Sequence, residues 1–162
     1  MTNNKIKLEY ELSSGIPQGS TLSPTLFNIA MSKIHRKVEE TNRVKLLSYA
    51  DDLLMIVGID NLSNAAIINK KIEELNNALK ELGLGLNSNK TQMMFISRRH
   101  DKEEFQKNLE GKIKMDGKSL IFKTEIKYLG LILDPTLNFN KQVEYITSKI
   151  KKYYNKIRSL YA

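Results

Sequence analysis

Residues 46–57, Leu-Leu-Ser-Tyr-Ala-Asp-Asp-Leu-Leu-Met-Ile-Val, place two adjacent carboxylates, Asp51 and Asp52, inside an apolar run. Apolar β-forming residues on both sides predict two short strands, and the two-residue polar break predicts a tight hairpin. Two like charges about 4 Å apart repel by roughly 4 kcal/mol at an effective dielectric of 20. A divalent cation would turn that repulsion into a binding site, since carboxylate oxygens suit Mg²⁺. Asp is also a good turn residue, so a solvated hairpin tip without metal is the alternative.

Composition restricts the class of protein. The length of 162 residues predicts one domain with room for a hydrophobic core, and the net charge of +8 suits a polyanionic partner such as nucleic acid. There are no cysteines, which excludes disulfides and zinc sites built on thiolates. His35 and His100 are far apart in sequence, so each is expected to be a surface side chain. Without a long apolar run or a signal peptide, we expect an intracellular protein with no membrane partner.

The segment before the carboxylates predicts a strand, a loop and a helix. Apolar and charged residues alternate over residues 1–12, which predicts a strand with one buried face. In the loop Gly-Ile-Pro-Gln-Gly, two glycines around Pro17 permit a fixed backbone path and the close approach of a ligand. Ser23 is a candidate N-cap and Pro24 suits the first turn of the helix that follows.

The chain after the carboxylates is predicted to alternate between helices and strands. The last helix has an apolar seam and a basic face rich in lysine. The alternation of helices and strands along the chain predicts an α+β fold in which helices pack on one side of a sheet. The predicted elements are a helix over 63–82, a strand over 92–97, a loop or short helix over 98–111, a hairpin at Asp116-Gly117, a strand over 126–134 and a helix over 140–160.

Four short motifs follow one another along the chain. They are Gly-Ile-Pro-Gln-Gly-Ser with Leu-Ser-Pro over 15–24, Tyr-Ala-Asp-Asp over 49–52, Asn-x-x-Lys-Thr over 87–91 and Tyr-Leu-Gly over 128–130. In this order they resemble the reverse transcriptase (RNA-directed DNA polymerase) domain of non-LTR, LINE-type retrotransposons. Group II intron and retron polymerases share the first two motifs, and the downstream run favours the non-LTR class.

The resemblance implies a fold and its partners. It implies an α+β fold with a partial, polymerase palm-type antiparallel sheet packed by helices over residues 1–139, and the first thumb helix over 140–162. It also implies RNA-templated DNA synthesis by nucleotidyl transfer, with two Mg²⁺ (or Mn²⁺) ions as cofactors. The partners would be an RNA template, a DNA primer and deoxynucleoside triphosphates.

The resemblance also implies roles for individual residues. Asp51 and Asp52 would hold the metal, and Lys90 would reach the incoming nucleotide and assist proton transfer to pyrophosphate. Lys90 could equally be a solvated loop lysine, and the basic face of the last helix could be a solvated face. The other implied sites are Pro17, Gln18, Gly19 and Tyr49 at the nucleotide and template, Tyr128, Leu129 and Gly130 in the primer grip, and Lys149, Lys152 and Lys156 on nucleic acid.

One part of the family's pattern has no match. The family takes another catalytic carboxylate from a strand several dozen residues before the Pro-Gln-Gly loop, whereas here 14 residues precede Gly15 and none is Asp. We therefore expect the fingers and the upstream palm strand to be missing, and the chain to be inactive alone. An upstream polymerase half, on the same or another chain, would then be a partner. The alternatives are a non-catalytic nucleic-acid-binding remnant and a structural module that needs no metal.

Overall fold

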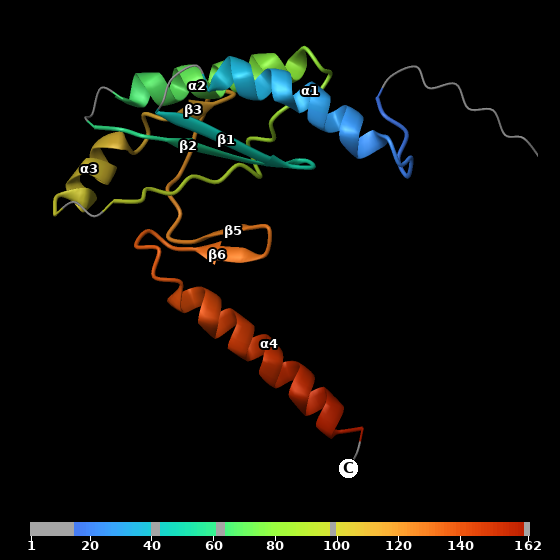
Figure 1. Ribbon diagram of the computed structural model, residues 1–162. Coiled ribbons are helices and arrows are strands. Elements are labelled where there is room, and N and C mark those ends of the chain that lie inside the picture. The colour runs from blue at the N-terminus through green and yellow to red at the C-terminus, as the bar shows by residue number, and fades with distance from the viewer. Residues whose placement is uncertain (1–14, 40–42, 61–63, 98–99, 161–162) are drawn as a thin grey trace, which may run out of the picture.

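The computed structural model describes residues 15–39, 43–60, 64–97 and 100–160 (Figure 1). The strand predicted over residues 1–12 lies outside these ranges. The described helices are α1 (Ser23–Val38), α2 (Asn64–Lys80), α3 (Lys102–Leu109) and α4 (Asn140–Arg158). The described strands are β1 (Val44–Tyr49), β2 (Asp52–Val57), β3 (Lys114–Met115), β4 (Lys118–Ser119), β5 (Ile126–Tyr128) and β6 (Leu131–Leu133).

The mixture of helices and antiparallel strands confirms the α+β class. Within the described ranges the strands form three separate two-stranded sheets, β1-β2, β3-β4 and β5-β6, and no larger continuous sheet. Each pair is an antiparallel hairpin joined by a short turn.

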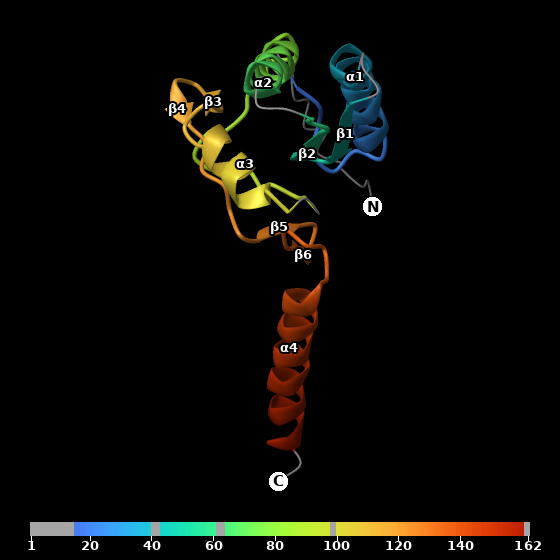
Figure 2. The ribbon, with the colours of Figure 1, turned by 90° about the vertical axis from the view of Figure 1, so that its left-hand side faces the viewer.

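The main core lies between the β1-β2 hairpin and the helices α1 and α2. Both helices cover the same face of the hairpin, as the two views show (Figures 1 and 2). Val44 and Leu46 are buried against them, whereas Lys45 and Leu47 are exposed, which is the period of two expected of a sheet with one covered face. The helices contribute the buried side chains of Met31, Ile34, Val38, Leu75, Ala78 and Leu79.

A second, smaller core forms around α3. Phe105 and Leu109 of this helix are buried, and the Phe105 ring stacks on Phe95 with centroids 5.5 Å apart. The β3-β4 hairpin closes this core with Met115. Asp116 (φ +50°) and Gly117 (φ +76°) form its turn, which confirms the predicted hairpin because a type I′ turn needs positive φ at both central residues.

The strand predicted over 92–97 is wrong. Only Met93 takes part in a β-bridge there, parallel to Phe122, and its carbonyl accepts a hydrogen bond of 2.7 Å from the Lys123 N–H. Met93 and Phe95 of this segment pack on the second core, so its β-like composition reflects packing and not strand pairing.

The prediction of one strand over 126–134 is also wrong. This segment folds back on itself as the β5-β6 hairpin, with Leu129 (φ +47°) and Gly130 (φ +85°) in the turn. Glycine adopts positive φ without steric cost, so the tight turn is possible inside an apolar run.

The helix α4 extends away from the rest of the molecule and contacts the β5-β6 hairpin (Figures 1 and 2).

The loop before α4 is built on Asp134, which is 7% exposed and accepts hydrogen bonds from Thr136 Oγ1 (2.6 Å), Thr136 N (2.9 Å) and Phe139 N (3.1 Å). The pKa of this carboxyl is lowered, chiefly by the hydrogen bond from the Thr136 hydroxyl. Desolvation opposes this shift, and hydrogen bonds from the backbone N–H groups of Thr136, Phe139 and Asn138 add to it. None of the helices in the described ranges is both long and apolar enough to cross a membrane.

Candidate active site

The two adjacent carboxylates lie where β1 turns into β2. Tyr49 pairs with Asp52, so Ala50 and Asp51 are the two turn residues, and the turn begins one residue earlier than the predicted Asp-Asp break. Ala50 has φ +50°. Two-residue hairpins require a positive φ at the first central position, and this requirement explains the unusual conformation of an alanine here.

Asp52 lies on the helix-free face of the hairpin. Directly paired residues of an antiparallel ladder point to the same face, so Asp52 shares a face with Tyr49, and Leu47 lies two residues along it. Val44 and Leu46 point to the opposite face, toward the helices. The β5-β6 hairpin lies on the side of β1-β2 that the helices leave free (Figures 1 and 2).

Both Asp51 and Asp52 are exposed, and this lowers the cost of placing them side by side. Near the dielectric constant of water, two charges 4 Å apart repel by only about 1 kcal/mol, a quarter of the repulsion expected from the sequence. Salt bridges within the described ranges involve neither carboxylate. The pair therefore offers two free sets of hard oxygen donors, which suits Mg²⁺.

The hairpin is held against α1 by side chains for which the sequence predicted no such role. His35 Nε2 and Ser48 Oγ form a hydrogen bond of 2.8 Å, and the Leu46 N–H donates to Glu39 Oε1 at 2.7 Å. The prediction that His35 is a surface side chain is wrong, because it is partly buried at this junction. Its spacing of four residues from Met31, on the buried stripe of α1, was the signal that could have placed it.

The Pro-Gln-Gly loop is fixed to the start of α1. Ser23 is the first residue of the helix and not its N-cap, and its hydroxyl donates to the Pro17 carbonyl. Gly19 has φ +87°, which a residue with a Cβ rarely adopts. Gln18 and Gly19 are exposed. The loop and the β1-β2 turn both lie toward the right-hand side of Figure 1.

Lys90 lies in a turn organised by Asn87. The Asn87 side-chain oxygen accepts hydrogen bonds from the backbone N–H groups of Asn89 (3.0 Å) and Lys90 (3.3 Å). The backbone carbonyl of Asn87 accepts a hydrogen bond from the Thr91 hydroxyl (2.8 Å). The Lys90 side chain is exposed, and in the described ranges it forms no ion pair with Asp51 or Asp52.

A basic cluster joins the β5-β6 hairpin to α4. Lys127 Nζ donates to Tyr145 Oη at 3.0 Å, and Lys149 Nζ lies 4.6 Å from the centre of the same ring. Hydrogen bonds from Lys149 and Lys127 lower the pKa of the Tyr145 phenol to about 8. Lys127 and Tyr145 were missed in the sequence, although Lys127 precedes the Tyr-Leu-Gly motif and Tyr145 lies one helical turn before Lys149.

The remaining predicted site residues lie in the β5-β6 hairpin and in α4. Tyr128 ends β5, and Leu129 and Gly130 form the exposed turn of the hairpin. Lys149, Lys152 and Lys156 lie three and four residues apart on α4, so they share one face of this helix, and all are exposed.

Comparison with known proteins decides the family. The family model described as "Reverse transcriptase (RNA-dependent DNA polymerase)" matches residues 1–133. The chain belongs to the reverse transcriptase family. A curated relative, the Retrovirus-related Pol polyprotein from type-1 retrotransposable element R1 of Bradysia coprophila, is 22% identical over 141 residues, which are 86% of this chain and 13% of that protein. No solved structure matches the chain.

The predicted family is thereby confirmed as a reverse transcriptase domain of a non-LTR element. The matched residues include the Asp51-Asp52 turn, the Pro-Gln-Gly loop, Lys90 and the Tyr128–Gly130 turn, whereas α4 follows them. The roles of these residues in this reverse transcriptase domain remain predictions.

A complete metal site needs more than the described residues provide. They contain no group of three or more His, Cys, Asp or Glu side chains that could hold a metal ion. Asp51 and Asp52 fit the chemistry of Mg²⁺ or Mn²⁺ as oxygen donors.

Proposed function

We propose that this chain is the part of a non-LTR reverse transcriptase palm that carries Asp51 and Asp52, and that it takes part in RNA-templated DNA synthesis. One observation carries the proposal: two adjacent, exposed carboxylates lie at a hairpin turn, without cationic partners in the described ranges. Residues 1–139 would belong to the palm and 140–162 to the start of the thumb.

In this proposal Asp51 and Asp52 hold divalent metal. When bound, Mg²⁺ or Mn²⁺ would lower the pKa of the primer hydroxyl and stabilise charge on the triphosphate. The exposed Pro17-Gln18-Gly19 loop would contact nucleotide and template together with Tyr49. Lys90 would approach the leaving pyrophosphate.

The primer-template duplex would lie along the β5-β6 hairpin and α4. The turn at Tyr128–Gly130 would contact the primer, and Lys127 and Lys149, both beside Tyr145, would bind backbone phosphates. Lys152 and Lys156 continue this positive surface along α4. Nucleic-acid binding by such a surface weakens steeply with salt, because each neutralised phosphate releases counterions.

The 162-residue polypeptide has no Asp before Asp51. A metal site that lacks one carboxylate anchor loses several orders of magnitude in rate if each metal ion stabilises several kcal/mol of transition-state charge. We therefore propose that this polypeptide binds nucleic acid but does not extend a primer by itself.

Primer extension on an RNA template with a DNA primer, deoxynucleotides and Mg²⁺ tests this. We expect duplex binding without extension by the wild-type polypeptide and by its Asp51→Asn variant. Extension by the wild type alone would establish polymerase activity and overturn the proposal that the polypeptide is inactive by itself. Failure of a folded wild-type polypeptide to bind the duplex would overturn the proposed function.

A non-catalytic nucleic-acid-binding role is the second candidate. The observation that favours it is the basic surface of α4 and β5, which needs no metal. Under this role Mg²⁺ would not bind at Asp51 and Asp52, and an Asp51→Asn variant would behave as the wild type in every metal-dependent measurement.

A further inference from the structure

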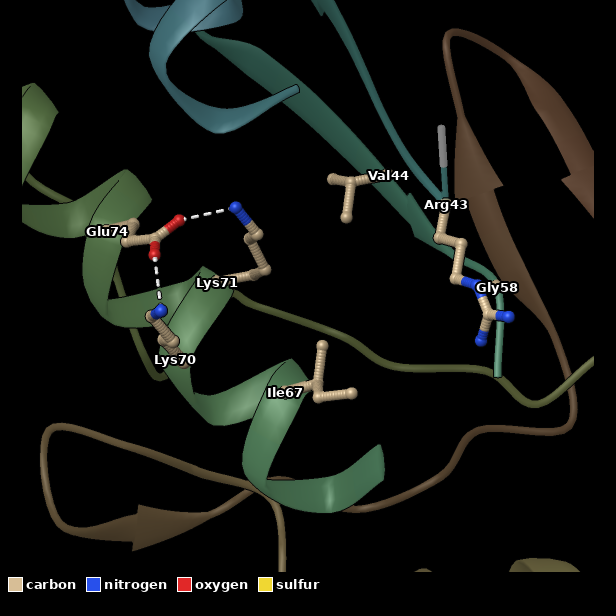
Figure 3. Close-up of a pocket in the computed structure, with 7 residues that line it drawn as sticks. All are labelled: Arg43, Val44, Gly58, Ile67, Lys70, Lys71 and Glu74. Atoms are coloured by element: carbon tan, nitrogen blue, oxygen red, sulfur yellow. Dashed lines mark hydrogen bonds and ion pairs between the residues drawn. The ribbon is translucent and has the colours of Figure 1, made fainter. Parts of the chain in front are cut away.

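A pocket lies at the end of the β1-β2 hairpin opposite the Asp51-Asp52 turn. It forms between the start of β1, the end of β2 and the first half of α2 (Figure 3). The residues that line it are Arg43, Val44, Gly58, Ile67, Lys70, Lys71 and Glu74. The strand register separates it from the turn, because Val44 pairs with Val57 and Tyr49 with Asp52 at the two ends of the hairpin.

The pocket carries an excess of positive charge. Glu74 is the one carboxylate that lines the pocket, and it forms ion pairs with two lysines. The Glu74 oxygens lie 2.6 Å from Lys71 Nζ and 3.7 Å from Lys70 Nζ. Arg43 adds a third cation, which pairs outside the lining with the exposed Asp60. Lys70 and Arg43 are largely exposed, so an incoming anion can reach both.

Lys71 is the buried member of this group. It is 6% exposed, and within the described ranges its ammonium group donates a hydrogen bond to Glu74. An ammonium group has three N–H donors, and burial without partners is costly for those left over. Val44 beside it is apolar and buried, which strengthens the attraction between Lys71 and any anion that enters.

We propose that this pocket is an anion site that binds a backbone phosphate of an RNA strand, separately from the carboxylate turn. A phosphodiester has two non-bridging oxygens. These oxygens can accept hydrogen bonds from the N–H groups of Lys71 that Glu74 does not engage. Lys70 and the Arg43 guanidinium can reach the same phosphate from the open side of the pocket. The overall charge of +8 favours a polyanion over a single acidic side chain as the source of this group.

RNA binding by matched variants tests the proposal on the whole 162-residue chain. The exposed residues Arg43 and Lys70 are each changed to Gln, which avoids disturbing the buried Lys71. Lys80→Gln is the control, because Lys80 is an exposed residue of the same helix outside the pocket. The measurements are the affinity for a short single-stranded RNA as a function of salt, and amide NMR shifts during titration with inorganic phosphate. Neither measurement needs metal or catalysis, so a failure here is separable from a failure of the proposed polymerase function.

We expect phosphate to shift the amide signals of Ile67 and Lys71 saturably. We also expect Arg43→Gln and Lys70→Gln each to weaken RNA binding several-fold and to reduce the salt slope by about 0.7, the value for one single-strand phosphate contact. Lys80→Gln should match the wild type. The proposal is overturned if phosphate leaves these signals unchanged, or if the pocket variants lose no more affinity than Lys80→Gln. Displacement of phosphate from the pocket by a polyglutamate peptide but not by RNA would assign the site to an acidic protein and would also overturn it.

Discussion

Replacing Asp51 by Asn should abolish the stabilisation that Mg²⁺ gives to this chain. A ligand that binds only the folded state, at ten times its Kd, stabilises by about 1.4 kcal/mol. For a chain of 162 residues this corresponds to a rise in Tm of roughly 3–6 °C. Without metal, the Asn variant loses one of two adjacent exposed charges, and the relief of repulsion is at most about 1 kcal/mol. Metal-free Asp51→Asn should therefore melt at the wild-type temperature or slightly above it.

Thermal unfolding followed by circular dichroism, with Mg²⁺ or with a chelator at constant ionic strength, measures both effects. Asp116→Asn is the matched control, because Asp116 is also an exposed aspartate in a two-residue hairpin turn. The wild type and Asp116→Asn should gain stability with Mg²⁺, and Asp51→Asn should not. An equal gain in Asp51→Asn, or no gain in the wild type, would refute the inference that these carboxylates hold metal.

Three further predictions concern the hairpin and the basic cluster. Leu46→Ala should lower the free energy of unfolding by about 2–5 kcal/mol in urea denaturation, because the side chain is buried, whereas Leu47→Ala on the open face should cost within roughly 1 kcal/mol. Equal losses for the two would show that the hairpin face is assigned wrongly. Ala50→Gly should raise that free energy by up to about 1 kcal/mol, since glycine removes the cost of φ +50°, and a destabilised variant would show that the turn is not strained. For primer-template binding, affinity should fall as the pH rises through about 8, because the Tyr145 phenolate then cancels the charge of one neighbouring lysine. Fluorescence anisotropy of a labelled primer-template measures this affinity, and Tyr145→Phe should not lose affinity over the same pH range. A Tyr145→Phe variant with the pH profile of the wild type would contradict the attribution of the loss to the Tyr145 phenolate.

The long helices were predictable from the sequence. The helices predicted to start at Ser23 and to run over 63–82 and 140–160 match α1, α2 and α4 to within about two residues at most ends, because amphipathic repeats of this length leave few alternatives. The helix α4 differs in one respect: its apolar seam, which includes Ile150 and Ile157, is exposed in the structure. Periodicity identifies an apolar face but not the surface that covers it.

The short elements were not predictable from pattern alone. The segment 126–134 is apolar throughout, and nothing in its pattern shows that Leu129 would adopt positive φ and turn the strand back. The segment 92–97 has strand composition, yet tertiary packing places it against α3 without a regular partner strand.

The candidate site likewise combines features that the sequence predicts with contacts that it does not. The Asp51-Asp52 pair was identified because its motif is local. The contacts His35–Ser48 and Lys127–Tyr145 join segments 13 and 18 residues apart, and the pocket brings Arg43 to α2, so none follows from a local pattern.

Supplying the upstream catalytic carboxylate that the resemblance implies tests the central claim most directly. A reverse transcriptase segment that carries this carboxylate can be joined to residues 1–162, and the fusion can be assayed for Mg²⁺-dependent extension of a DNA primer on RNA. We predict that the fusion extends the primer, that Asp51→Asn in the fusion abolishes extension, and that Asp116→Asn does not. Extension that persists in the Asp51→Asn fusion would contradict the claim that this hairpin supplies the catalytic carboxylate.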